Sequence, residues 1–301
     1  MRLFLGVDGG QSGTTAVIGD ETGRVLGTGE AGPCNHAAAG EGRAKLERAV
    51  LGSVAAACAQ AGLDAATVEF EAACFGMSGG PDDKRDILAG ILRTGRLIVT
   101  NDAVIALAGA TTDGVGIITI AGTGSIAFGR NREGRSARAG GWGYIFGDEG
   151  GGFDIARQAL RASLRMEEGW GPATQLRDLL LAETGARDAN QMLHFFYTDD
   201  WPRSRVARLA KIVDHAAETD SVALEIVNNA AQQLAVFAGS VRGQLWEPGA
   251  EIEVAYIGGV FESGRLRERF RMLVEMTDGV RCIAPRRGPA EGALWEAIRG
   301  G

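Results

Sequence analysis

The hydrophobic and polar positions repeat one pattern twice: a short apolar strand, a turn rich in glycine and hydroxyl residues, and a second apolar strand. The first copy spans residues 3–18, with Asp8 just before the turn 9–15, and the second spans 117–128 around the turn 121–125. Either turn alone is typical of an ordinary hairpin. Glycine also lets backbone N–H groups approach an anion, and Ser and Thr hydroxyls add donors. The repetition therefore favours two turns that hold one polyphosphate from opposite sides.

Strand and helix periodicities then give the order of elements. The first part of the chain predicts strands at 3–8, 15–20 and 24–30, a helix at 42–60, a strand at 72–77, a helix at 82–93, a strand at 96–100 and a helix starting at 103. After a boundary at 111–114 the opening repeats, 152–243 is mainly helical, 253–257 is a strand, and the last helix follows Pro289. This order predicts two homologous α/β domains, 1–112 and 113–288. The C-terminal helix, 289–301, is expected to pack back on the first domain.

Composition permits a large soluble enzyme and by itself excludes little else. The 301 residues are 45% hydrophobic, and 31 basic against 38 acidic side chains give a net charge of −7. No basic block suited to nucleic acid is present, and no apolar run is long enough to be a signal peptide or to span a bilayer. We therefore expect neither a nucleic-acid nor a membrane partner, and a cytoplasmic location. The four cysteines are widely separated and predict neither a zinc site nor a disulfide framework.

Two aspartates stand where phosphoryl-transfer chemistry would need them. Asp8 ends a strand before the first turn and could hold a metal ion or cap the turn. Asp102 lies where a strand ends and a helix begins, so it could be a general base or a helix N-cap. Ser78 lies in a glycine-rich loop but lacks the Gly-x-Ser-x-Gly frame of a serine nucleophile, and we set it aside. No P-loop motif with its phosphate-binding lysine occurs.

Five segments resemble those of a known group. Residues 8–15, 121–125 and 257–263 resemble the two phosphate segments and the adenosine segment of the actin-like ATPase superfamily. Within it, residues 101–103 and 140–151 are most similar to the N-acetylglucosamine kinase and BadF/BadG/BcrA/BcrD-type ATPase family. The segment 140–151, Gly-Gly-Trp-Gly-Tyr-Ile-Phe-Gly-Asp-Glu-Gly-Gly, is long and specific. The resemblance covers essentially the whole chain.

The resemblance implies two RNase H-like domains facing an interdomain cleft, ATP and Mg²⁺ as cofactors, and a site made from both domains. It implies that Asp8 holds the metal and that Asp102 orients and deprotonates the sugar hydroxyl. The residues that it places at the nucleotide are Asp8, Gly10, Ser12, Gly122, Thr123, Gly124, Gly258, Gly259 and Ser263. Those that it places at the sugar are Asn35, Asp102, Gly141, Trp142, Gly143 and Asp148. Without it, Trp142 would be a core aromatic, Asp148 part of a solvated turn, and Asn35 a turn residue.

The expected function is ATP-dependent phosphorylation of a small amino sugar, with N-acetylglucosamine and its 6-phosphate as first choice. Ala37, Ala38 and Ala139 replace the bulkier residues that animal-type N-acetylglucosamine kinases carry, so glucosamine and a muramic acid sugar stay open. An ATPase that activates an acyl-CoA dehydratase or reductase is an alternative, but it needs thiolates for an iron–sulfur cluster. A non-catalytic sugar- or ATP-binding module is another. A homodimer is left open.

Overall fold

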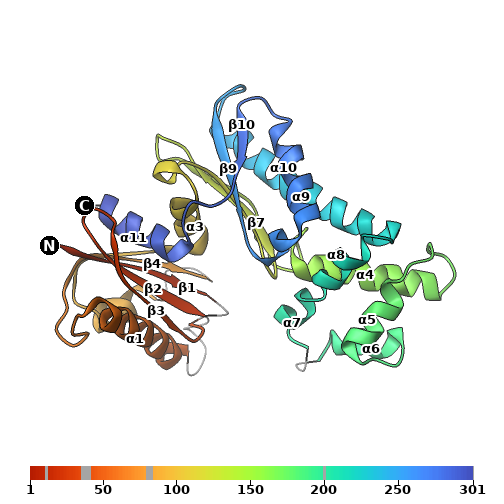
Figure 1. The fold of residues 1–301 in the computed structure, drawn as a ribbon, viewed down its shortest axis with the longest axis horizontal. Helices are drawn as coiled ribbons and strands as arrows, with labels where there is room; N and C mark the ends of the chain where they lie inside the picture. Colours follow the sequence, from red (N-terminus) through yellow and green to blue (C-terminus); the bar gives the residue numbers. More distant parts are fainter. Residues whose placement is uncertain (11–12, 35–41, 79–83, 199–200, 301) are drawn as a thin grey trace. The chain divides into compact units, whose positions relative to one another are not determined.

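The computed structural model describes residues 1–10, 13–34, 42–78, 84–198 and 201–300. The chain forms two compact units, the first made of Met1–Gly116 and Ala284–Gly301, the second of Ile117–Ile283. Each unit has a five-stranded mixed sheet with helices packed against it (Figure 1). Both are RNase H-like in their strand order, so the predicted α/β class with two such domains is confirmed. Among the described residues, no helix is both long enough and apolar enough to cross a membrane.

The first unit has the sheet order β3-β2-β1-β4-β5. β1 pairs antiparallel with β2 and parallel with β4, and β4 pairs parallel with β5. Its elements are β1 (Leu3–Gly9), β2 (Thr14–Asp20), β3 (Val25–Ala31), α1 (Gly42–Ala61), β4 (Phe70–Met77), α2 (Arg85–Ile91), β5 (Thr94–Asn101), α3 (Asp102–Ala110), a 3-10 turn η1 (Thr112–Gly114) and α11 (Pro289–Arg299). The predicted order is confirmed in this unit.

Alternation along β1 separates two cores. Leu5 and Val7 pack with the apolar stripe of α1, whereas Phe4 packs with Leu294 of α11 on the opposite face. Figure 1 shows α1 on one side of this sheet and α11 on the other. Because side chains in a strand alternate between faces, Asp8 belongs to the same face as Phe4, the one covered by α11. The alternation thus determines which helices surround the carboxylate.

Glycines let α3 and α11 approach each other and the sheet closely. A Cβ at Gly292 of α11 would collide with backbone atoms of Ile105 and Gly109 in α3, and a Cβ at Gly6 would collide with the backbone of α11. A Cβ at Gly76 of β4 would likewise collide with the Ile105 side chain. Such backbone contact requires residues without side chains. It fixes the start of α3, and therefore Asp102, against the strand ends.

The second unit has the order β10-β9-β6-β7-β8, with β6 and β10 parallel to β9 and β8 antiparallel to β7. Its elements are β6 (Gly116–Ala121), β7 (Ser125–Arg130), β8 (Ser136–Gly140), α4 (Gly152–Glu167), α5 (Leu176–Thr184), α6 (Ala189–Phe195), α7 (Arg203–Ala207), α8 (Ala210–Ala216), α9 (Ser221–Leu245), β9 (Ile252–Ile257), η2 (Gly259–Glu262), α10 (Gly264–Glu275) and β10 (Val280–Ile283). The helices α4 to α9 occupy the region predicted to be mainly helical.

Three elements of the second unit were not predicted: β8, α10 and β10. β8 has the sequence Ser-Ala-Arg-Ala-Gly and β10 has only four residues, so neither carries a strong β-branched or aromatic pattern. Four arginines interrupt α10, and only Leu266, Phe270 and Val274 are buried, at helical spacing. Pairing with β7 and β9 makes the strands regular despite their weak local pattern.

Candidate active site

The first group of predicted site residues lies at the carboxyl ends of β1, β4 and β5. Asp8 is opposite Gly76, and Met77 is opposite Asn101, so these parallel strands end at the same edge. The Ser78 N–H donates to the Gly9 carbonyl at 3.0 Å and carries the pairing one residue further. Asp8, Ser78 and Asp102 are thus collected at one edge, where α/β sheets commonly place ligands.

Asp102 is not the cap of α3. The N-cap is Asn101, whose side-chain oxygen accepts a hydrogen bond from Val104 N at 3.0 Å. Asp102 is the first residue of the helix, and burial raises the pKa of its carboxyl group, partly offset by the backbone N–H groups of Ala103 and Asp102 itself. The cap interpretation of Asp102 is therefore wrong, because its neighbour already performs that role. The carboxylate is left for other chemistry.

Asp8 has a strongly perturbed carboxyl group. Burial, followed by the negative charge of Asp102, raises its pKa to about 6. Two acidic groups that disfavour each other's ionisation would gain from a cation between them or beside them. Magnesium in kinases is bound by one or two carboxylates together with phosphate oxygens and water, which is the donor set that Asp8 and Asp102 can offer.

Ser78 is a residue that sequence reasoning set aside. Its hydroxyl oxygen is buried and has no hydrogen-bond partner within the described part of the chain. A buried hydroxyl without a partner is costly in a folded protein and is uncommon outside functional sites. The position of Ser78 in the sequence could have indicated its role, because it comes directly after the strand that pairs with β1. It lies one residue beyond Met77, which is opposite Gly9.

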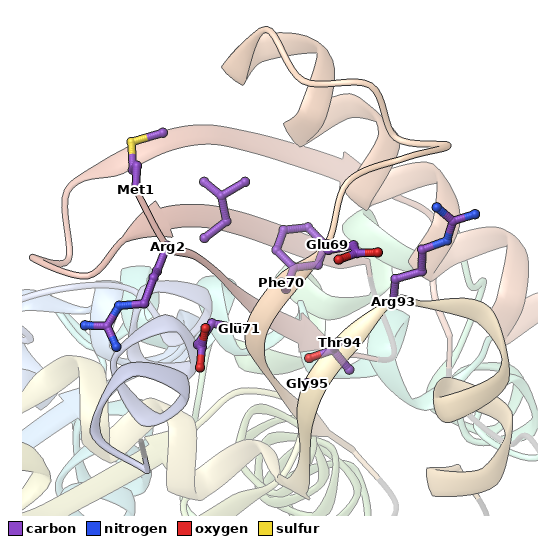
Figure 2. A pocket seen from close by; sticks show the side chains of 9 residues that line it. Met1, Arg2, Glu69, Phe70, Glu71, Arg93, Thr94 and Gly95 are labelled. Carbon is purple, nitrogen blue, oxygen red and sulfur yellow. The ribbon is translucent and has the colours of Figure 1, made fainter.

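Two pockets lie at different ends of the first sheet. The smaller, about 430 Å³, includes Asp8 and Thr15 and the start of α11 at Pro289 to Glu291. The larger, about 670 Å³, is lined by Met1, Arg2, Leu3, Glu69, Phe70, Glu71, Arg93, Thr94 and Gly95 (Figure 2). These residues are at the amino ends of the strands, and Leu3 is about 17 Å from Asp8 along β1. Asp8 lines the smaller pocket and Asp102 lines neither, so of the two pockets the smaller one contains a residue expected at the site.

The second group lies in the second unit, around the turn between β6 and β7. The Gly122 and Thr123 carbonyls accept from Gly152 N at 2.8 Å and Phe153 N at 3.1 Å, at the start of α4. Gly122 has open space where a Cβ would be, whereas a Cβ at Gly124 would collide with the Asp148 carboxylate. Neither glycine has a positive φ. Gly122 is thus the position where backbone is exposed to a ligand, and Gly124 is required by Asp148.

Asp148 is held in a defined place next to this turn. It has a positive φ of 63°, which is unusual for a residue other than glycine. Its Oδ1 atom is 3.4 Å from Ser125 N, and its Oδ2 atom is 3.1 Å from Nη2 of Arg203. The Ser125 hydroxyl donates to the Glu149 carbonyl at 2.6 Å, which ties the two segments together. The alternative of a solvated turn is wrong for Asp148, whose side chain is 8% exposed.

Trp142 is on the surface of the second unit. Its side chain is 66% exposed, so the alternative of a core aromatic is wrong. The flanking Gly141 and Gly143 have φ of 73° and 78°, and the Arg138 guanidinium is 4.7 Å from the Trp142 ring centroid. The backbone of this segment and the aromatic ring are available to a ligand. That is the combination a sugar-binding wall requires.

The predicted adenosine segment follows β9 and contacts the same turn. Gly258 has a φ of 112°, and a Cβ there would collide with the backbone of Ala121. Gly259 is nearly open, with a Glu262 oxygen at 3.9 Å as its nearest neighbour. The Ser263 hydroxyl caps α10 by accepting from Leu266 N and also donates to Asp214. Gly258 and Gly259 expose backbone, while the Ser263 side chain is engaged in the helix cap.

Ser12 and Asn35 lie outside the described residues, and so do Ala37 and Ala38. Gly10, at the start of the first turn, donates from its N–H to the Gly13 carbonyl at 2.9 Å and accepts from Cys34 N at 3.3 Å. Gly10 is therefore joined by backbone hydrogen bonds to both Gly13 and Cys34.

Sequence comparison identifies the family to which this combination of segments belongs. The model of the BadF/BadG/BcrA/BcrD ATPase family matches residues 5–297. The chain belongs to the BadF/BadG/BcrA/BcrD ATPase family. This is a family of ATPases, which agrees with the phosphate-binding role expected of the two glycine-rich turns. The resemblance proposed from the sequence is confirmed.

Relatives within and near this family have named activities. The chain is 32% identical to the N-acetylmuramic acid/N-acetylglucosamine kinase of Clostridium acetobutylicum, over 98% of this chain and 97% of that protein. It is 31% identical to the N-acetyl-D-glucosamine kinase of Dictyostelium discoideum, over 87% and 86% of the two chains. Among solved structures, a Chromobacterium violaceum protein provisionally assigned as an N-acetylglucosamine kinase gives a TM-score of 0.81 at 29% identity, covering 98% of both chains.

Proposed function

We propose that the protein is an ATP-dependent amino-sugar kinase that phosphorylates the 6-hydroxyl of N-acetylglucosamine. The observation that carries the proposal is the Asp102 carboxylate: it is freed from helix capping by Asn101, is partly buried, and lies close enough to Asp8 to raise the pKa of that second carboxyl. The names of the relatives support the substrate class. Phosphoryl transfer is the reaction that a general base, a metal-binding carboxylate and phosphate-binding turns would together support.

In this proposal each group of residues has one task. Asp8 holds Mg²⁺, and the backbone of the two turns, with Gly10, Ser12, Gly122, Thr123 and Gly124, holds the phosphates. The remaining ATP contacts come from Gly258, Gly259 and Ser263, and the sugar contacts from Asn35, Gly141, Trp142, Gly143 and Asp148. When bound, Mg²⁺ supplies positive charge that offsets the charge of the phosphate oxygens. The described turns contain no lysine that could do so.

Asp102 moves the proton. The sugar hydroxyl oxygen forms a bond to the γ-phosphorus while the bond from that phosphorus to the bridging oxygen of ADP breaks, and the hydroxyl proton passes to Asp102. A raised pKa makes the carboxylate a better proton acceptor than an exposed aspartate, although it stays ionised above its pKa. The carboxylate also orients the sugar hydroxyl before transfer, and such positioning of the reacting groups lowers the barrier to the reaction.

The alternative role as an activator of an acyl-CoA dehydratase or reductase is not favoured. Cys34, Cys58 and Cys74 are buried and form no disulfide, and Cys282 is partly buried on β10 of the other unit. A cluster shared between subunits needs accessible thiolates. Burial raises the pKa of Cys282 to about 12, which further disfavours its thiolate form.

A phosphorylation screen tests the proposal. Purified protein with MgATP is offered N-acetylglucosamine, N-acetylmuramic acid, glucosamine and glucose, and ADP release is measured with the Asp102→Asn variant as the blank. We expect sugar-dependent ADP release with N-acetylglucosamine and a 6-phosphate product by mass spectrometry and NMR. Absence of sugar-dependent release with every sugar, or a brown iron–sulfur chromophore in the purified protein, would contradict it.

A further inference from the structure

A guanidinium lies against Asp148, the carboxylate assigned to the sugar. Arg203, the first residue of α7, reaches 55 positions back along the chain so that its Nη2 atom is 3.1 Å from Asp148 Oδ2. Its guanidinium carbon is 4.4 Å from the Tyr144 ring centroid and 5.7 Å from that of Phe153. The planar group is thus stacked on an aromatic surface and held at the edge of Asp148.

The pair differs from a closed structural ion pair in its exposure. The Asp148 side chain is 8% exposed, but the Arg203 side chain is 39% exposed. Asp148 is fixed from the other side by Ser125 N and by the close approach of Gly124. The carboxylate is therefore the immobile partner, and the guanidinium presents the accessible side of the pair.

Within the described part of the chain, Arg203 has hydrogen-bond donors without an acceptor. A guanidinium has five N–H groups, and among the described residues Asp148 is its recorded acceptor. Its buried Nε atom has no partner there. The Nε atom of Arg157 also has no described partner, but both terminal nitrogens of Arg157 donate, Nη1 to the Tyr144 carbonyl at 3.2 Å and Nη2 to Asp154 at 2.6 Å. Arg203 uses one terminal nitrogen for Asp148, so its other terminal nitrogen can donate to a second anion.

We propose that Arg203 recognises a carboxylate carried by the sugar, so that the substrate class includes acidic amino sugars as well as neutral ones. The proposal rests on the assignment of Asp148 to the hexose. N-acetylmuramic acid is N-acetylglucosamine with a lactyl ether on O3, which adds one carboxylate close to the ring. Asp148 alone would repel that group, whereas Arg203 offsets the charge of Asp148 and supplies a fork that matches a carboxylate.

The test compares two sugars in matched variants. Arg203→Met keeps the apolar stem against Tyr144 without the charge, and Arg203→Lys keeps the charge without the fork. Arg205→Met removes another guanidinium from the same helix, one that stacks 4.0 Å from the Trp201 ring centroid. For each protein, kcat/KM is measured with N-acetylmuramic acid and with N-acetylglucosamine, and their ratio is the readout. A thermal melt reports folding.

We expect the wild type to use both sugars. The ratio of acidic to neutral sugar should fall about 10- to 150-fold in Arg203→Met, the range expected for losing a hydrogen bond to a charged group. It should fall less in Arg203→Lys and stay unchanged in Arg205→Met. The KM for N-acetylmuramic acid should also rise with ionic strength more than the KM for N-acetylglucosamine.

Each other outcome overturns a distinct step. A wild type that phosphorylates N-acetylglucosamine but not N-acetylmuramic acid removes this inference and leaves the proposed function intact. Equal losses with both sugars in Arg203→Met would show that Arg203 only positions Asp148, and an unchanged ratio would show that it is not involved. If Arg203→Met does not fold, the ratio in Arg203→Lys decides. A wild type inactive on every sugar removes the proposed function and this inference together.

Discussion

Replacing Asp102 by Asn should separate catalysis from stability. The amide keeps the shape of the side chain but cannot accept the proton of the sugar hydroxyl, so turnover should fall by about 10²- to 10⁴-fold. Stability should not fall, because Asn101 and not Asp102 caps α3. Since burial raises the pKa of the Asp102 carboxyl, the ionised form is disfavoured in the folded state, and a neutral amide should leave the free energy of unfolding equal or higher at pH 8.

The neighbouring residue provides a matched control. Asn101→Ala removes the bond from Val104 N to the cap and should cost about 1 kcal/mol of stability, or a few degrees in Tm, with little loss of turnover. Asn101→Asp should restore the cap. The two positions thus predict opposite patterns: loss of turnover without loss of stability at 102, and the reverse at 101.

The Asp102 variant also changes its partner carboxyl. The negative charge of Asp102 contributes to raising the pKa of Asp8 to about 6, so Asp102→Asn should lower that pKa. Magnesium–nucleotide binding should then persist to a lower pH than in the wild type. The assays are coupled ADP release, thermal melts, and calorimetry of MgATP binding between pH 5 and 8. A turnover within about fivefold of wild type in Asp102→Asn would refute the base assignment.

Three further predictions follow from the same geometry. The folded pKa of Asp8, about 6, exceeds its usual 3.8, so the stabilising contribution of the neutral form is complete below about pH 3.8 and is lost as pH rises through 6. In ligand-free protein at pH 7.5, Asp8→Asn should therefore be more stable than wild type by up to about 3 kcal/mol in urea unfolding. Equal stability of the two proteins would contradict the raised pKa. Ser78→Ala removes a buried hydroxyl without a described partner, so stability should hold while kcat/KM falls about tenfold; unchanged kinetics would assign Ser78 no role at the site. Gly124→Ala should displace Asp148 and therefore weaken sugar binding as well as ATP binding, whereas Gly122→Ala faces open space and should weaken ATP binding alone. Calorimetry in which both variants leave sugar binding unchanged would contradict this division.

The local sequence determined much of the fold and part of the site. Apolar alternation and helical spacing predicted the three opening strands, α1 and the repeat in the second unit, because those patterns depend on residues close together in the chain. Asp8 and Asp102 were both selected from the sequence because each follows a predicted strand. Leu46, Val50, Val54 and Ala57 have helical spacing in the sequence, and all four are buried in α1.

Contacts between distant residues decided the rest. The cap of α3 is Asn101 because its side chain, rather than that of Asp102, reaches Val104 N. Ser78 became a site candidate only when β4 paired with β1 and enclosed its hydroxyl, and Gly124 was explained only by Asp148. Arg203 contacts Asp148, which lies 55 residues earlier in the chain. The local sequence pattern around Arg203 predicts a helix but does not indicate which residues that helix contacts. Periodicity records which face of an element is buried, but pairing between particular side chains depends on how elements far apart in sequence pack together.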